Sequence, residues 1–327
     1  MSVNPLTIVI PTRDRPDLLE KCLNSVYVCQ TTIPTVVVSD NSTRDHPVID
    51  TFRRRYGFDY VRQSGNLSQT DHINVCCLKL PESPWVLLLH DDDELYPECL
   101  GALQAFLANC HAIGIVVAGI QFIDYEGVVQ KEWTPDADRM LRGEEALLQL
   151  GLNWHARPPG MILNVAECRR FGGFIDICGT AADYTLAVQL AYSAGLAFLP
   201  ALVGRYRQGQ QQLTDFSTPE KSSAWLEFSI RLAEQAAPPG CSRDAAEQII
   251  DYMTWWTFLG IASHWFSSHP PLVINLARKG LRRSPRCGVW QTRVRREYPF
   301  LYWQPAWLAW RLCRLARRFR RLLLSAR

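Results

Sequence analysis

The chain has 327 residues, of which 47% are hydrophobic and 20% charged, and a chain of this length and composition can bury a large core. This composition excludes an intrinsically disordered protein. The eleven cysteines contain no C-x-x-C pair, which disfavours structural zinc and indicates buried thiols in a reducing compartment. Because the N-terminus lacks the basic region and long apolar core of a signal peptide, we expect a cytoplasmic protein.

The net charge of +3 hides an uneven distribution of charge along the chain. Residues 278–327 hold fifteen Lys or Arg and one acid, whereas residues 1–277 hold twenty bases and thirty-one acids. A basic C-terminal segment behind an acidic body is typical of a protein that meets an anionic surface, either a membrane or a nucleic acid.

The first hundred residues alternate predicted strands with predicted helices. The strands are expected at residues 6–10, 35–39, about 60–62 and 85–89, and the helices at 15–23 and 69–80. Strands separated by helices form βαβ units, which place successive loops at one edge of a parallel sheet. The alternation therefore predicts an α/β fold with a mostly parallel, Rossmann-like sheet flanked by helices.

Polar residues follow each of these predicted strands. They lie at residues 12–14, 40–42, 66–68 and 91–93. Because ligands bind at the carboxyl ends of the strands in open α/β sheets, parallel strands would bring all four groups to one site.

The sharpest local signal follows the apolar strand at 85–89, where His90 precedes four consecutive acids, residues 91–94. Adjacent carboxylates repel one another unless a cation or water neutralises them. Hard oxygen ligands at the end of a strand suit Mg²⁺ or Mn²⁺, especially when substrate phosphates complete the coordination shell. The alternative is a solvated acidic turn.

Beyond Pro219 the sequence changes to helical patterns, with helices predicted at 222–236 and 245–267. From residue 306 one face collects apolar side chains and another collects arginines: Leu308, Leu312, Leu315, Phe319 and Leu322 against Arg311, Arg314, Arg318 and Arg321. This pattern is typical of an amphipathic helix in a membrane interface. The alternative is an ordinary surface helix that packs its leucines on the body.

Three segments near the N-terminus together resemble a known family. IVIPTRDRPDLLEKCLNSV, VVVSDNST and LLLHDDDELYPECL resemble the opening strand and helix, the nucleotide-contacting Asp, and the Asp-x-Asp region of family 2 glycosyltransferases with the GT-A fold. Further similarity lies at residues 171–176, 181–184, 205–207 and 212–214. The resemblance thus spans about residues 5–215 and implies sugar transfer from a nucleotide diphospho-sugar to an acceptor hydroxyl, usually with inversion.

The resemblance also implies roles for particular residues. They are Pro11, Thr12 and Asp14 at the nucleoside, Asp40 at the base, Asp91 near the ribose, Asp92 on the metal with Asp93 in support, and Asp183 as catalytic base. Asp183 directly precedes a predicted helix, so a helix-capping role is the alternative for it. The chemistry agrees with these roles, since a divalent ion stabilises a departing diphosphate and a carboxylate can accept the acceptor proton.

The chain departs from the family pattern in three places. His90 stands at the first acid position, and Thr70-Asp71-His72 stands where the family often has Ala-Arg-Asn, which removes a cation from the donor site. Gly209 takes the position of a His that can join the metal in many relatives. We therefore predict weak metal affinity, with Mg²⁺ serving about as well as Mn²⁺, and Arg207 as the cation that grips the diphosphate.

These observations predict an inverting, metal-dependent glycosyltransferase that elongates a lipid-linked saccharide of a bacterial surface polysaccharide. The expected organisation is a GT-A domain at 1–218, with a nucleotide-sugar half at about 1–100 and an acceptor half at about 101–218. A helical extension at 219–301 and a basic tail helix at 302–327 follow. The tail would hold the protein on the anionic inner face of the cell membrane, with no nucleic acid partner. The alternative is a catalytically inactive nucleotide-binding fold that binds membrane, nucleic acid or a partner through the tail.

Overall fold

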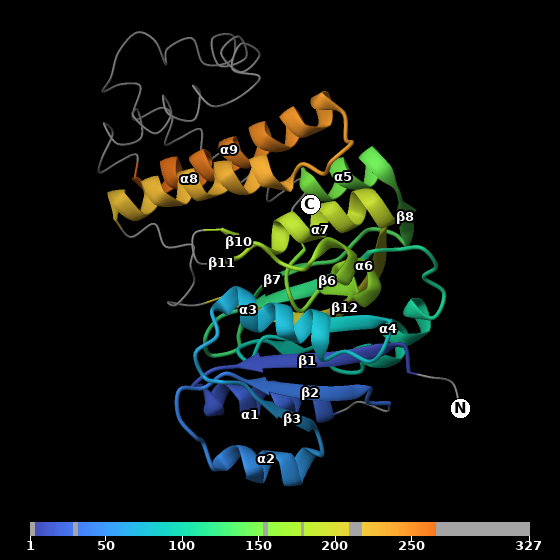
Figure 1. Cartoon of the computed structure of the whole chain (residues 1–327), viewed down its shortest axis with the longest axis vertical. Coiled ribbons are helices and arrows are strands. Elements are labelled where there is room, and N and C mark those ends of the chain that lie inside the picture. The colour runs from blue at the N-terminus through green and yellow to red at the C-terminus, as the bar shows by residue number, and fades with distance from the viewer. Residues whose placement is uncertain (1–3, 29–31, 153–155, 178–179, 209–217, 266–327) are drawn as a thin grey trace. The chain divides into compact units, whose positions relative to one another are not determined.

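The computed structural model describes residues 4–28, 32–152, 156–177, 180–208 and 218–265 (Figure 1). The chain divides into two compact units between Gln211 and Gln212. The predictions made for Gly209 and for the tail at 302–327 concern residues outside the described ranges. The proposed domain boundaries stay predictions.

A ten-stranded sheet forms the centre of the first unit, with the strand order β3-β2-β1-β4-β9-β6-β12-β5. The strands are β1 (Leu6–Thr12), β2 (Thr35–Asp40), β3 (Asp59–Arg62), β4 (Trp85–Leu88), β5 (Glu94–Leu95), β6 (Ile115–Ile123), β9 (Met161–Asn164) and β12 (Leu196–Arg207). Two more strands pair outside this path, β7 (Val129–Trp133) with β6 and β8 (Arg139–Leu141) with β12. A separate small sheet pairs β10 (Asp176–Ile177) with β11 (Thr180–Ala181).

The sheet is parallel in its N-terminal part and mixed beyond it. Strands β3, β2, β1 and β4 pair in parallel, which is the arrangement that the alternating strand and helix pattern predicts. Strand β9 then lies antiparallel between β4 and β6, and β12 runs parallel to β6. The α/β fold is confirmed, and the antiparallel strand β9 joins its parallel N-terminal part to the rest of the sheet.

Helices flank this sheet along the chain (Figure 1). They are α1 (Pro16–Tyr27), α2 (Val48–Tyr56), α3 (Gln69–Asn74), α4 (Cys99–Leu107), α5 (Gly143–Gly151), α6 (Val165–Phe171) and α7 (Asp183–Ala194). The helix expected at 69–80 is α3 continued by a π-helical turn, η1 (Val75–Lys79). Helix α2, which was not predicted from the sequence, ends at Tyr56 and is followed by Gly57 in the left-handed conformation that glycine adopts readily.

The core of the first unit is built on strands that are buried on both faces. Every residue of β1 is buried, and Leu6, Ile8 and Ile10 join one core cluster with Leu19 and Leu23 of α1. Pro16 suits the first turn of α1 because its missing N–H would have no helical partner there. The buried strands carry their polar loops to the carboxyl edge of the sheet, where they are held against a rigid core.

The described part of the second unit is a pair of helices, α8 (Pro219–Ala236) and α9 (Arg243–Trp265), which pack side by side (Figure 1). Thr218 accepts the backbone N–H of Lys221 and so caps α8. Leu226, Ile230 and Ala233 form the buried stripe of that helix. Both helices were predicted from the sequence. Within the described ranges, no helix is both long enough and apolar enough to span a bilayer.

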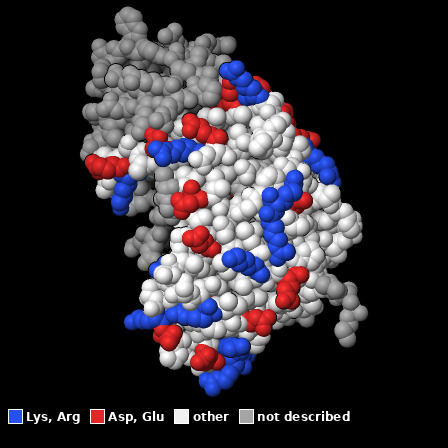
Figure 2. All heavy atoms as spheres, viewed as in Figure 1, with Lys and Arg blue, Asp and Glu red and all other residues white. Residues whose placement is uncertain are grey.

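Six of the seven cysteines described as free thiols are buried, which agrees with their interpretation as small apolar core residues. On the visible face of the molecule, acidic and basic side chains are interspersed over the described residues (Figure 2). Mixed charges of this kind keep a surface solvated.

Candidate active site

The polar groups that follow β1, β2, β3 and β4 meet in one hydrogen-bonded network. Thr12 Oγ1 at the end of β1 donates to Asp91 Oδ2 over 2.8 Å, and the Asn41 N–H donates to the Thr12 carbonyl over 2.9 Å. The Asn41 side chain donates to the Leu67 carbonyl over 3.0 Å and accepts the Leu67 N–H over 3.3 Å. The predicted convergence of these loops is therefore observed.

The residues expected at the nucleoside lie in this network. Asp40 is buried, and its carboxylate accepts the Tyr60 hydroxyl over 2.7 Å and pairs with Arg62 over 3.1 Å. Asp14 has a left-handed backbone (φ 55) and accepts the N–H and hydroxyl of Thr43 over 3.0 Å each. Pro11 and Thr12 are buried at the end of β1. Their contacts with a nucleotide stay predictions.

The acidic loop, residues 91–94 after β4, places its carboxylates in different environments. Asp91 and Asp93 are buried, whereas the Asp92 side chain is 36% exposed. Burial raises the pKa of Asp91 to about 7, although Arg15 and Thr12 favour its ionised form. The solvated acidic turn considered from the sequence does not describe this loop, because two of its acids are inside the protein.

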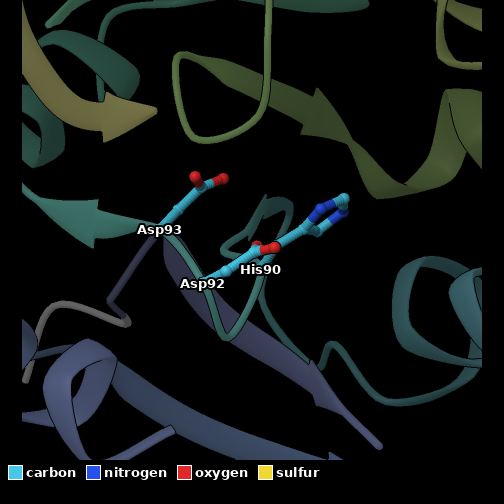
Figure 3. Close-up of side chains that lie close together, drawn as sticks. All are labelled: His90, Asp92 and Asp93. Atoms are coloured by element: carbon cyan, nitrogen blue, oxygen red, sulfur yellow. The ribbon is translucent and has the colours of Figure 1, made fainter. Parts of the chain in front are cut away.

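Three side chains of this loop could hold a metal ion together. One ligand atom each from His90, Asp92 and Asp93 lie within 4.8 Å of one another (Figure 3). Asp93 Oδ1 accepts the Arg207 N–H over 2.8 Å, but its buried Oδ2 has no hydrogen-bond partner among the described residues. Burial raises the pKa of Asp93 well above its usual value, so a cation would both satisfy Oδ2 and hold the carboxylate ionised.

From the sequence, His90 was expected near the site, at the position of the family's first acid, but it was not named as a metal ligand. Burial lowers its pKa, which favours the neutral imidazole that metals bind. The sequence signal was its position directly before the acids. The two carboxylates and one imidazole fit a divalent transition ion.

Asp183 begins α7, and its Oδ1 accepts the N–H of Tyr184 over 2.7 Å. The residue that caps α7 is Ala182, and no side chain caps that helix end. Burial raises the pKa of Asp183, and the nearby charges of Arg157 and His90 oppose that rise. A carboxylate with a raised pKa is a better proton acceptor than an ordinary Asp. Asp183 is thus suited to act as a base, and its hydrogen bond to the first turn of α7 also orients it.

Tyr206 on β12 links Asp183 electrostatically to the acidic loop. Burial, together with the negative charges of Asp93, Asp183 and Asp92, raises the pKa of Tyr206 to about 12, while Arg157 opposes the shift. The charges of the acidic loop and of the candidate base thus both act on Tyr206.

A polar latch joins α3 to the segment that leads into α7. Asn74 accepts the Phe174 N–H over 2.8 Å and donates to the Phe174 carbonyl over 2.9 Å. Gly173 (φ 84) packs so closely on Asn74 that a Cβ would clash, and Thr70 donates to Asp176 over 3.0 Å. The departure at residues 70–72 therefore has a structural role, since His72 also bonds Ser39 in the core.

The guanidinium of Arg207 is bound by other residues of the chain. Its guanidinium pairs with Glu94 and donates to the carbonyls of Asp92, Asp124 and Tyr125. Only 5% of its side chain is exposed. This arrangement fastens the acidic loop to β12, and contact of Arg207 with a diphosphate stays a prediction that would require several of these bonds to break.

Comparisons with known proteins agree with this geometry. The family model described as "Glycosyl transferase family 2" matches residues 7–166. None of the curated proteins matches the sequence.

Solved structures show the same fold at low sequence identity. Staphylococcus aureus TarS, residues 1–349, is similar over 86% of this chain and 82% of its own, with 18% identity and a TM-score of 0.61. Its complex with UDP-GlcNAc has a TM-score of 0.62 and 17% identity over the same shares. The mannosyltransferase PcManGT from Pyrobaculum calidifontis, in complex with GDP-Man and Mn²⁺, is also similar. The match covers 97% of this chain and 87% of the PcManGT chain, with 13% identity and a TM-score of 0.51.

Proposed function

Because the chain is a family 2 glycosyltransferase, we propose that it moves a sugar from a nucleoside diphospho-sugar to an acceptor hydroxyl with the aid of a divalent cation. The observation that carries this proposal is the cluster of His90, Asp92 and Asp93 at the end of β4, within the electrostatic reach of the candidate base Asp183. The cluster lies where the strand ends converge, which is the usual ligand edge of such sheets.

The donor class is supported by the structural neighbours. TarS is seen with UDP-GlcNAc and PcManGT with GDP-Man and Mn²⁺, and both share the fold of this chain. His90, Asp92 and Asp93 would hold the cation, whose positive charge offsets the negative charge that grows on the departing nucleoside diphosphate. Asp40 and Asp14 would then contact the nucleoside, as the resemblance implies.

Asp183 would accept the proton of the acceptor hydroxyl as that oxygen attacks the anomeric carbon. Its raised pKa brings its basicity closer to neutral pH, where a general base works best. Attack from the face opposite the leaving diphosphate inverts the anomeric centre. The base therefore belongs on the acceptor side of the metal cluster.

We further propose that the acceptor is a lipid-linked saccharide of a bacterial surface polysaccharide. The support is the charge asymmetry of the sequence, with fifteen bases and one acid in residues 278–327. A basic segment with interleaved aromatic and leucine residues suits an anionic membrane surface, where such an acceptor would be embedded.

The test is hydrolysis or transfer from a panel of UDP- and GDP-sugars by the full chain, with Mn²⁺ and after chelation. Wild-type protein should turn over at least one donor only with the metal. Asp92→Asn should lower that rate about a thousandfold because an amide is a poor ligand for a divalent cation. Asp50→Asn, on the exposed face of α2, removes a carboxylate outside the site and should keep the wild-type rate. Equal rates for wild-type and Asp92→Asn protein would refute the metal-assisted mechanism.

A further inference from the structure

Arg15 connects the start of α1 to the acidic loop. Its guanidinium lies 2.5 Å from Asp91 Oδ1 through Nη2 and 3.1 Å from Asp92 Oδ2 through Nη1. The Arg15 carbonyl accepts the N–H of Leu19 over 3.1 Å, so the helix fixes the backbone of the residue that carries this charge. The positively charged guanidinium of Arg15 thus bridges two neighbouring carboxylates.

The two halves of this bridge are unequal. Asp91 is completely buried, and Thr12 also donates to it, whereas the Asp92 side chain is 36% exposed. Separating Arg15 from Asp91 would leave a buried carboxylate without its counter-charge, which is strongly unfavourable. The pair with Asp92 is close to solvent and is much easier to break. Arg15 is therefore anchored on one side and exchangeable on the other.

The exchangeable side belongs to the metal cluster. Asp92 lies with His90 and Asp93, so the carboxylate that Arg15 holds is one that a divalent cation would also need. Two positive charges close to one carboxylate repel each other, and this repulsion is little screened at short range.

We propose that Arg15 competes with the metal ion for the Asp92 carboxylate. Without a cation, Arg15 pairs with Asp92; when the cation binds, Arg15 releases Asp92 and keeps its pair with Asp91. This inference rests on the metal site of the proposed function. Arg15 is a positioning residue in this account, since it acts on the cation through Asp92. It keeps the acidic loop ordered before the metal arrives and at the same time weakens the affinity of the loop for metal.

Weak metal binding was expected from Gly209, which lies outside the described residues. Arg15 supplies a different source for the same property. A site whose metal is opposed by a resident cation would fill when the donor phosphates add their own negative charge. Metal binding would then depend on the presence of the nucleoside diphosphate.

The test is Mn²⁺ titration of the full chain by calorimetry, without nucleotide, for wild-type, Arg15→Gln and Arg15→Lys proteins. Arg15→Gln should bind Mn²⁺ about tenfold more tightly because the competing charge is gone. Arg15→Lys keeps the charge but replaces a two-armed guanidinium with a single ammonium, which can stay on Asp91 and free Asp92. Its affinity should increase about threefold.

Lys21→Gln is the matched control, since Lys21 is exposed on α1 and its substitution makes the same change in net charge. Its Mn²⁺ affinity should equal that of the wild type. Thermal unfolding gives a second readout, in which Mn²⁺ should raise the melting temperature of Arg15→Gln more than that of the wild type. A merely structural role would lower both melting temperatures of the variant equally, with and without Mn²⁺.

The outcomes separate this inference from the function on which it rests. If wild-type protein binds no Mn²⁺ even with UDP or GDP present, the metal site itself fails. If the wild type binds Mn²⁺ and Arg15→Lys and Arg15→Gln bind it no more tightly, the competitor role is overturned. Should Arg15→Gln not fold, the comparison of Arg15→Lys with Lys21→Gln still decides the question.

Discussion

The acidic loop and the start of α7 carry the two halves of the proposed chemistry, and they are held in place in opposite ways. Asp91, Asp92 and Asp93 are bound by residues from distant elements, such as Thr12, Arg15 and Arg207. Asp183 instead accepts a hydrogen bond from Tyr184, the next residue in its own helix. Changes to the acidic loop should therefore alter metal binding and stability, whereas changes at Asp183 should alter the rate alone.

The largest expected effect sharpens this contrast at Asp183. Asp183→Asn should lower transfer to an acceptor by about 10²–10⁴-fold, because it removes the general base. Donor and Mn²⁺ affinities should stay at their wild-type values, as measured by calorimetry. Asp138 is an exposed carboxylate in the predicted acceptor half, and Asp138→Asn should change neither the transfer rate nor these affinities. A parallel loss of donor affinity would show that Asp183 supports the structure of the donor site.

A smaller effect is expected at the metal cluster, in the choice of metal. His90 adds an imidazole to two carboxylates, and imidazole favours Mn²⁺ over Mg²⁺. We therefore replace the sequence-based expectation of equal Mg²⁺ and Mn²⁺ use with a preference for Mn²⁺. His90→Asp should reduce the ratio of Mn²⁺ to Mg²⁺ affinity about tenfold. An unchanged ratio would place His90 outside the coordination shell.

The latch between α3 and the segment before α7 tests whether the two regions are coupled. Asn74→Ala leaves the N–H and carbonyl of the buried Phe174 without their partner, which should lower stability by about 1–3 kcal/mol. Because that segment leads to Asp183, kcat should fall several-fold while the donor KM is unchanged. Asn109→Ala, an exposed amide on the surface, is the control for both measurements. A loss of stability with an unchanged kcat would mean that the latch does not position the base.

The smallest effect concerns pH. Asp183 works as a base only when it is deprotonated, so activity should rise with pH through its pKa, which burial raises above the usual value. Arg157 opposes that rise, so Arg157→Gln should move the acidic limb of the kcat profile to higher pH. Arg170→Gln, an exposed residue paired with Glu167, should leave the profile in place. A shift of the limb to lower pH would contradict the assignment of Asp183 as the titrating base.

The parts of the molecule that sequence could predict are those that depend on neighbours along the chain. Strands β1 to β4 and the convergence of their loops follow from local apolar patterns and the βαβ rule. The antiparallel position of β9 did not follow, because it depends on how strands far apart in sequence pair across the sheet.

The same limit applies to the site. Asp92, Asp93 and Asp183 were identified from motifs, whereas the Arg15 bridge and the Asn74 latch join residues 77 and 100 positions apart. The environment of Arg207 was also hidden, since its partners come from two segments far from it in sequence, residues 92–94 and 124–125. Such contacts are set by tertiary structure and leave no periodic signal in the sequence.

The most direct test of the account is an anomalous difference map from crystals of the full chain grown with Mn²⁺ and UDP or GDP. We expect a manganese peak bound by His90, Asp92 and Asp93, with the Arg15 guanidinium still on Asp91 and no longer on Asp92. A manganese ion bound elsewhere, or an Arg15–Asp92 pair intact beside a filled site, would contradict it.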